Sequence, residues 1–177
     1  EVEAPEVLTT PPSGCRVNYF LATWSGQRLK TEFDDSHLKK HIDQLNKVNH
    51  NLAQITIGYP ENPNVTQEYD TYIRSLQKLE DGTPIIVHPM ENKGYSYGQY
   101  SRMYETYRDS FDYYVFVEDD YVPFTDGFDS ILIDLYNDRP CGFLCGLVFD
   151  KTQRYGRSTP RHAAVSNGIA SSAALEI

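Results

Sequence analysis

Hydrophobic residues along this chain alternate between two spacings. Short continuous apolar runs, each closed by polar or turn-forming residues, occur at 16–24, 53–59, 84–88, from 113 onward and at 142–149. Such runs are typical of buried strands. Between them, apolar residues recur every three or four positions, which predicts amphipathic helices. The alternation predicts an α/β fold with a mostly parallel, Rossmann-like sheet covered by helices on both faces. Residues 166–177, rich in small side chains, predict a last strand and helix.

Four helices are expected between the strands. Capping residues place their starts at 34–36, Thr66, Ser96 and 125–126, and Ser96 has the capping-box spacing to Gln99. The second helix is expected to continue to 81–82. The residues predicted to face inward are Leu38, Ile42, Leu45 and Val48; Tyr69, Ile73, Leu76 and Leu79; Tyr97, Tyr100, Tyr104 and Tyr107; and Phe128, Ile131, Leu132 and Leu135.

Length and composition indicate how the chain is organised. The 177 residues, 40% of them hydrophobic, predict one globular domain at 15–177. Residues 1–14 hold three prolines and no aromatic residue, which is typical of a linker or tail and indicates a module of a longer, multidomain chain. The net charge of -9 argues against nucleic acid as the main partner. No apolar run is long enough for a membrane span.

The cysteines favour a reducing compartment. There are three, Cys15, Cys141 and Cys145, and an odd number argues against a disulfide framework. The expected location is therefore the cytoplasm. A luminal domain cut from an anchored enzyme is the alternative.

Three adjacent acids end the most hydrophobic of the predicted strands. After Tyr113-Tyr114-Val115-Phe116-Val117 the chain continues Glu118-Asp119-Asp120. Ligands bind beyond the carboxyl ends of parallel strands, so these acids are expected at the mouth of a crevice. Adjacent carboxylates repel one another, and a divalent cation such as Mn²⁺ or Mg²⁺ would offset that repulsion. An acidic strand end that simply faces water is the alternative.

A basic segment follows the fifth predicted strand. Residues 151–162 carry four lysine or arginine side chains and no acid. We expect a mobile loop that closes over a phosphate group, with Arg157 and Arg161 as its best phosphate ligands because a guanidinium fork matches phosphate oxygens. His162 is a candidate second metal ligand. The alternatives are a solvated loop and a histidine that packs at the start of a strand.

These motifs resemble those of nucleotide-sugar glycosyltransferases of the GT-A fold. The run Glu91-Asn92-Lys93-Gly94, followed by a helix and by a hydrophobic strand that ends in acids, resembles family 2 glycosyltransferases. Val117-Glu118-Asp119-Asp120 with Pro123, Phe128 and Leu132 is similar to the Glu-Asp-Asp variant of the Asp-x-Asp motif, as in N-acetylglucosaminyltransferase I and its relatives. The resemblance is specific over residues 91–132.

The resemblance implies a function and a set of site residues. The expected reaction moves a sugar from a UDP or GDP sugar donor to a carbohydrate or glycoprotein acceptor. The resemblance makes Asp120 a metal ligand and catalytic residue, and it places Glu118 and Asp119 near the ribose and base. The remaining candidate donor contacts are Thr23, Trp24, Asn92, Gly94 and Arg102.

The chain also departs from the family pattern. Inverting members need a carboxylate base. Asp150 is the candidate catalytic acid late in the chain, and only Glu176 follows it. The Arg-Asn pair that family 2 carries on the helix before the acidic strand is absent, and Gln99, Ser101 and Arg102 occupy that region.

Two other functions remain open at this point. Residues 21–29 resemble the glycine-rich loop of sugar-nucleotide nucleotidyltransferases, although Thr23 and Trp24 replace two glycines that let the backbone approach phosphates. The other alternative is a non-catalytic module that binds a sugar or nucleotide in a multidomain protein.

Overall fold

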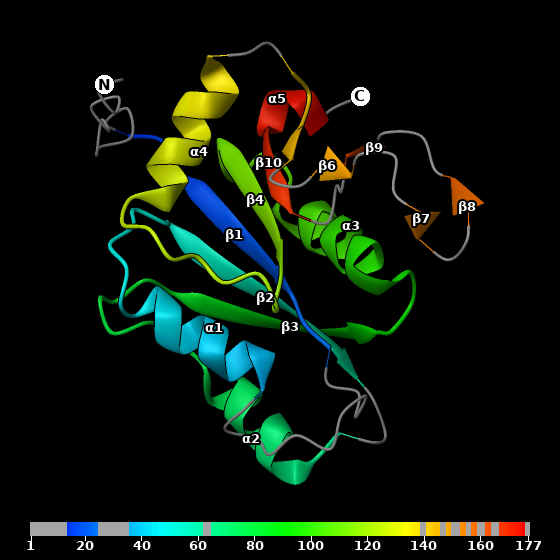
Figure 1. The fold of residues 1–177 in the computed structure, drawn as a ribbon. Helices are drawn as coiled ribbons and strands as arrows, with labels where there is room; N and C mark the ends of the chain where they lie inside the picture. The colour runs from blue at the N-terminus through cyan, green and yellow to red at the C-terminus, as the bar shows by residue number, and fades with distance from the viewer. Residues whose placement is uncertain are drawn as a thin grey trace, which may run out of the picture.

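The computed structural model describes residues 14–24, 36–61, 65–138, 141–145 and 167–175, together with the backbone of four two-residue strands at 148–149, 153–154, 157–158 and 162–163. The main sheet has the strand order β3-β2-β1-β4-β10-β5. Its strands are β1 (Val17–Ala22), β2 (Gln54–Glu61), β3 (Ile85–Glu91), β4 (Tyr113–Glu118), β5 (Leu144–Cys145) and β10 (Gly168–Ser171). Strands β1 to β4 pair in parallel, whereas β10 is antiparallel to both β4 and β5. The predicted α/β, mostly parallel sheet with β4 at its centre is confirmed (Figure 1).

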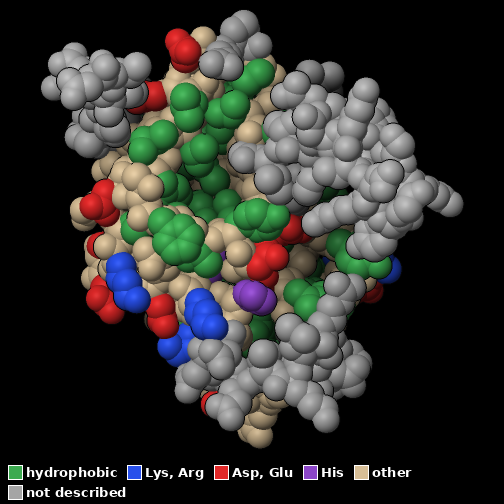
Figure 2. Space-filling model, viewed as in Figure 1, with side chains coloured by type: hydrophobic (Ala, Val, Ile, Leu, Met, Phe, Trp, Pro, Cys, Tyr) green, Lys and Arg blue, Asp and Glu red, His purple; other side chains and the backbone are tan. Residues whose placement is uncertain are grey.

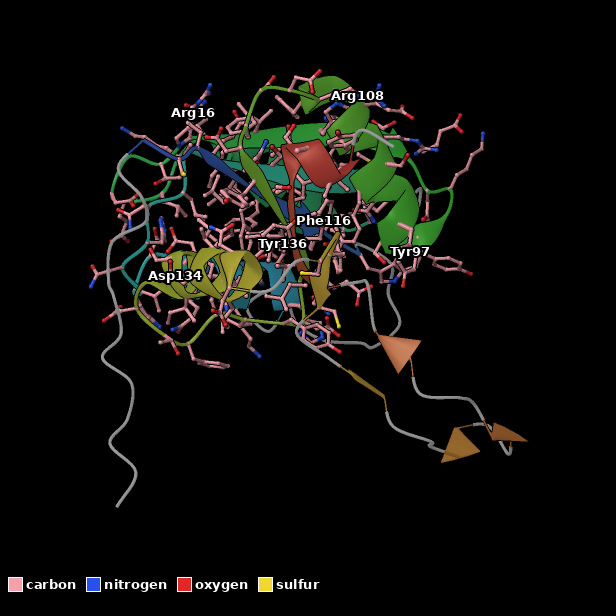
Figure 3. All side chains as sticks on the ribbon, turned by 90° about the horizontal axis from the view of Figure 1, so that it is seen from above. Arg16, Tyr97, Arg108, Phe116, Asp134 and Tyr136 are labelled. Atoms are coloured by element: carbon pink, nitrogen blue, oxygen red, sulfur yellow. The ribbon has the colours of Figure 1, made fainter. Side chains whose placement is uncertain are left out.

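Helices cover both faces of this sheet, as predicted. One hydrophobic core joins one face to α1 (His37–Leu45), α2 (Gln67–Ser75) and α4 (Phe128–Asn137). A second core joins the other face to α3 (Tyr95–Tyr107) and α5 (Ser172–Leu175). In Figure 3, Phe116 and Tyr136 lie in the interior, whereas Asp134, Arg108 and Tyr97 lie at the periphery. No helix in the described part of the chain has the length and hydrophobicity needed to cross a bilayer.

The strand order reverses direction at β1. From β1 the chain proceeds to β2 and β3 on one side and then returns to place β4 on the other side. In open α/β sheets, ligands bind in a crevice outside the carboxyl ends of the strands at such a reversal, which here lies between β1 and β4. The acids that follow Val117 lie at this crevice, because Glu118 is the last residue of β4 and pairs with Ala22.

The start of α3 differs from the prediction. The helix begins at Tyr95 behind Gly94, whose φ of 81° is left-handed, and no side chain caps it. Ser96 and Gln99 are buried inside the helix and do not form a capping box. Tyr100 and Met103 form its buried stripe, whereas Tyr97 is exposed. Gln99 does not cap the helix because its side-chain amide hydrogen-bonds to the backbone of Thr23, the residue after β1.

Helix α4 turns a face to the core that only partly matches the prediction, since Phe128 and Leu132 pack there as expected but Leu135 does not. It begins at Phe128 behind Gly127 and buries Asp129, Ser130, Ile133 and Tyr136, while Leu135 is 49% exposed. Two carboxylates hold this register: Asp126 accepts the backbone N–H of Asn49 at 2.8 Å, and Asp129 accepts that of Asn51 at 2.8 Å. These long-range hydrogen bonds overrode the hydrophobic pattern on which the prediction rested.

Two further elements end or divide where the pattern did not predict it. Helix α2 stops at Ser75, because Leu76 is already extended, and it does not reach 81–82. The run 142–149 forms β5 and a separate strand, β6 (Val148–Phe149), which pairs with β9 (His162–Ala163) outside the main sheet. Within 151–162, β7 (Gln153–Arg154) and β8 (Arg157–Ser158) pair antiparallel where a loop was expected.

Candidate functional site

The residues that leave β1 and β4 are tied together by their backbones. Asp119 N–H donates to the carbonyl of Ala22 at 3.0 Å, which extends the β1–β4 pairing by one step. Trp24 N–H donates to Asp119 Oδ2 at 3.3 Å. Of the sequence-predicted site residues, the structure thus brings Thr23, Trp24, Glu118, Asp119 and Asp120 together at one end of the sheet.

The three acids have different environments. Asp119 is 8% exposed, Glu118 is half-buried and Asp120 is exposed. Burial, and then the charges of Asp120 and Glu118, raise the pKa of the Asp119 carboxyl to about 7 against the opposing hydrogen bond from Trp24. Asp119 is therefore held inside the protein, whereas the exposed Asp120 carboxylate is accessible to a ligand.

Two buried side chains, Tyr19 and His41, support the acidic turn through a series of hydrogen bonds. Tyr19 Oη lies 2.8 Å from His41 Nε2, and His41 Nδ1 lies 3.2 Å from the carbonyl oxygen of Asp119. A carbonyl oxygen can only accept a hydrogen bond, so Nδ1 of His41 carries the proton and donates to it. Nε2 then accepts a hydrogen bond from the Tyr19 hydroxyl. Burial lowers the pKa of His41 to about 4, which keeps the ring neutral. Histidine on a helical stripe gave no sign of this role in the sequence.

An amide clamp fixes the end of β1. Gln99 Oε1 accepts the N–H of Thr23 at 3.0 Å, and Gln99 Nε2 donates to the Thr23 carbonyl at 2.9 Å. The Thr23 hydroxyl donates to the Gly58 carbonyl at 2.7 Å. A Cβ at Gly58 would lie 2.5 Å from Gln99 Oε1, so the clamp requires glycine at this position of β2. The backbone and hydroxyl of Thr23 thus hydrogen-bond within the protein, whereas the next residue, Trp24, is exposed.

Asn167 is a further residue that the sequence reasoning missed. It is buried immediately before β10, and its Oδ1 accepts the N–H of Glu118 at 3.0 Å. Tyr121 N–H donates to the Glu118 carbonyl at 3.0 Å and closes the turn after β4. The end of β1, α1 and the approach to β10 therefore all contribute hydrogen bonds to the acidic turn.

The other predicted donor contacts lie at the edge of the sheet. Asn92 and Gly94 follow β3, which β2 and β1 separate from β4. The Arg102 guanidinium donates to the carbonyl of Glu91. It lines an open groove with His88, Glu105 and Thr106. The structure thus places this group on the β3 side, apart from Glu118–Asp120 across the sheet.

The remaining candidates lie outside what the structure describes. Asp150 and Arg161 belong to the undescribed residues, and for Arg157 and His162 only the backbone is described. Their predicted roles as catalytic acid, phosphate contacts and second metal ligand stay predictions.

The described acids fit a metal that is bound mainly through its substrate. In the described ranges, no group of three or more His, Cys, Asp or Glu side chains is placed to hold a metal ion. Mg²⁺ in phosphate sites characteristically uses one or two carboxylates and completes its shell with phosphate oxygens and water. Asp120 and Glu118, two residues apart, could supply that donor set in a region whose own charges repel one another.

An apolar cavity of about 340 Å³ adjoins Asp120 on the α4 side of β4. Its described walls come from Tyr19, Val115, Val117, Tyr121, Val122, Pro123, Phe124, Phe128, Leu132, Asn167 and Gly168. Figure 2 shows a hollow with hydrophobic side chains along its floor, directly above a group of acidic and histidine side chains. Sequence periodicity did not reveal this cavity, because it depends on the register of α4.

Comparison with known proteins does not assign the chain to a family. No protein-family model matches the chain, and no curated protein matches it significantly.

Proposed function

We propose that this protein is a metal-dependent glycosyltransferase of the GT-A type that moves a sugar from a nucleoside-diphosphate sugar to an acceptor hydroxyl. The observation that carries the proposal is the exposed Asp120 carboxylate at the point where the strand order reverses, next to a turn that Trp24, His41 and Asn167 hold by hydrogen bonds. A rigid scaffold around one exposed ligand is what a preorganised site requires. The Glu-Asp-Asp sequence that resembles the family motif occupies this position.

The chemistry assigns a role to each described residue. A divalent cation bound there would neutralise charge on the departing diphosphate. Asp120 and Glu118 would hold that cation, while Asp119 fixes the N–H of Trp24 so that its ring borders the donor. In the transfer, the bond from the anomeric carbon to the diphosphate oxygen breaks and its electron pair leaves with the nucleoside diphosphate. The acceptor oxygen forms the new bond, and its proton passes to a carboxylate base, for which Asp150 stays a candidate.

Asp120→Ala tests the proposal. Calorimetric titration with UDP and GDP, with and without Mn²⁺, should show metal-dependent binding by the parent protein. The variant should lose at least about 100-fold of that affinity, because it lacks the metal ligand. Glu118→Ala should lose less. Asp134→Ala is the matched control, since Asp134 is an exposed acid on α4 away from the crevice (Figure 3).

Two results would contradict the proposal. One is a parent protein that binds neither nucleotide in the presence of Mn²⁺. The other is an Asp120→Ala protein whose metal-dependent affinity equals that of the parent and of Asp134→Ala.

A further inference from the structure

We propose that the apolar cavity between β4 and α4 binds the aromatic ring of a small hydroxylated ligand; its role as the acceptor site rests on the proposed function. The cavity and the acidic turn share Asp120, so a ligand seated in the cavity has its polar end at the carboxylate. The inference assigns a substrate class to the acceptor, which is an aryl group that carries a hydroxyl or a sugar.

The walls of the cavity favour an aromatic occupant. Four rings contribute to it, from Tyr19, Tyr121, Phe124 and Phe128, and Tyr19 and Phe128 meet edge-to-face with centroids 5.8 Å apart. A further ring can enter such a group with the edge-to-face geometry that aromatic pairs prefer. Val115 and Val117 of β4 form a flat aliphatic wall.

Apart from two tyrosine hydroxyls, the polar side chains in the described walls of the cavity are those of Asp120 and Asn167. Asp120 lies just after β4, and Asn167 lies just before β10. Phe128 and Leu132, on the other side of the cavity, belong to α4. Binding sites for small molecules typically combine apolar walls with a small number of polar groups that orient the ligand. The arrangement therefore orients a ligand with its ring towards α4 and its hydroxyl towards Asp120.

The size of the cavity agrees with one ring and its substituents. An apolar cavity of about 150 Å³ is large enough to bind benzene. The cavity here, about 340 Å³, has room for a ring with an attached group.

Exposed aromatic side chains border the same cavity. Phe124 is 82% exposed and Tyr121 is 42% exposed, and both lie in the segment that leads from the acidic turn to α4. Holding large apolar rings in water costs free energy unless they cover a ligand or partner. Their place at the cavity mouth matches rings that close over a bound ligand.

The test compares phenyl β-glucoside with methyl β-glucoside, which share the sugar and differ in the ring. Both are titrated into the full chain without nucleotide or metal, and binding is followed by ligand-observed NMR and calorimetry. Phenyl β-glucoside should bind about tenfold more tightly or better, because its ring leaves water. Equal affinities, or no binding of either compound, would overturn the inference.

Two variants on α4 locate the binding. Leu132→Trp fills the cavity and should reduce phenyl glucoside affinity at least about tenfold, whereas Leu135→Trp changes an exposed residue of the same helix and should leave it unaltered. Circular dichroism confirms that each variant is folded. Should Leu132→Trp fail to fold, Phe124→Ala at the exposed mouth replaces it and should lower the affinity. Unchanged affinity in the folded cavity variant would overturn the inference.

The outcome is independent of the Asp120 test. Aryl binding without metal-dependent nucleotide binding would remove the transferase proposal and leave an aryl-binding site. Metal-dependent nucleotide binding without a preference for the phenyl ring would remove this inference alone.

Discussion

The two faces of the central strand β4 are packed in opposite ways. Towards α3, Tyr114 and Phe116 lie in a closed group of aromatic rings. The ring of Phe116 contacts those of Phe20, Tyr100 and Phe143, at centroid distances of 5.6, 5.3 and 5.8 Å. Towards α4, the same strand packs Tyr113 on Tyr136 at its start, with ring centroids 5.9 Å apart, and then presents Val115 and Val117, which line the cavity. The alternation of large and small side chains along one strand thus decides on which side of the sheet space remains for a ligand.

Truncating one phenylalanine on each face is the strongest test of this comparison. Phe116→Ala should lower the free energy of unfolding by about 3 to 5 kcal/mol, because it opens a cavity in a closed ring cluster. Phe128→Ala should cost about 1 to 2 kcal/mol, since Phe128 already borders an open cavity and is only partly buried. Urea denaturation of the two variants measures both values. Equal losses would show that the α4 face is packed as tightly as the α3 face.

The pH dependence of stability tests the buried acid at the rim of the cavity. An unfolded Asp119 ionises near its ordinary pKa of 3.8, whereas the folded protein holds the proton up to about 7. The folded state therefore binds more protons between these values, and its stability falls as the pH rises through this window. Asp119→Asn removes this loss while its side-chain oxygen can still accept the Trp24 N–H.

The expected result is a difference between two pH profiles. Relative to the parent, Asp119→Asn should gain little at pH 4 and on the order of 2 to 4 kcal/mol above pH 7, by urea denaturation. The parent profile is itself flattened between pH 4 and 6.5, because the unfolded chain protonates His41 near pH 6.5 while burial keeps its pKa near 4 in the folded protein. This makes stability rise with pH in the same window and opposes the effect of Asp119. Parallel profiles for parent and variant would show that the burial of Asp119 has no such effect.

A double-mutant cycle tests the packing of Gln99 against Gly58, on the α3 side of the sheet at the carboxyl end of β1. Gly58→Ala should destabilise the protein by about 1 to 3 kcal/mol, because the new methyl group displaces Gln99 from Thr23. In a Gln99→Ala background the same substitution should cost much less, since the clamp is already absent. Additive losses would show that Gly58 and Gln99 act independently.

Sequence pattern predicted the sheet well because its signals are local. The apolar runs at 16–24 and from 113 gave β1 and β4, and Ser36 and Thr66 cap α1 and α2 as expected, each accepting a backbone N–H three residues on. The acidic turn was found for the same reason, since an apolar strand that ends in carboxylates is visible in eight consecutive residues. Its position at the β1–β4 crevice followed from the topology.

The supports of the site were invisible in the sequence because they act across long separations. Gln99 clamps Thr23, His41 supports Asp119, and Asn167 holds Glu118, in each case through a hydrogen bond between distant parts of the chain. No periodicity marks a residue whose partner lies on another element. The register of α4 was lost in the same way, because Asp126 and Asp129 bind the backbone near Asn49.

The antiparallel strand β10 also sets an order of events during translation. Strands β1 to β4 are synthesised before β10, which is the strand that pairs with the outer edge of β4. Until residues 168–171 have left the ribosome, β4 is an edge strand whose unpaired backbone groups and apolar side chains can meet another nascent chain. Protection of the second edge of the strand that carries the candidate site thus depends on a segment made much later.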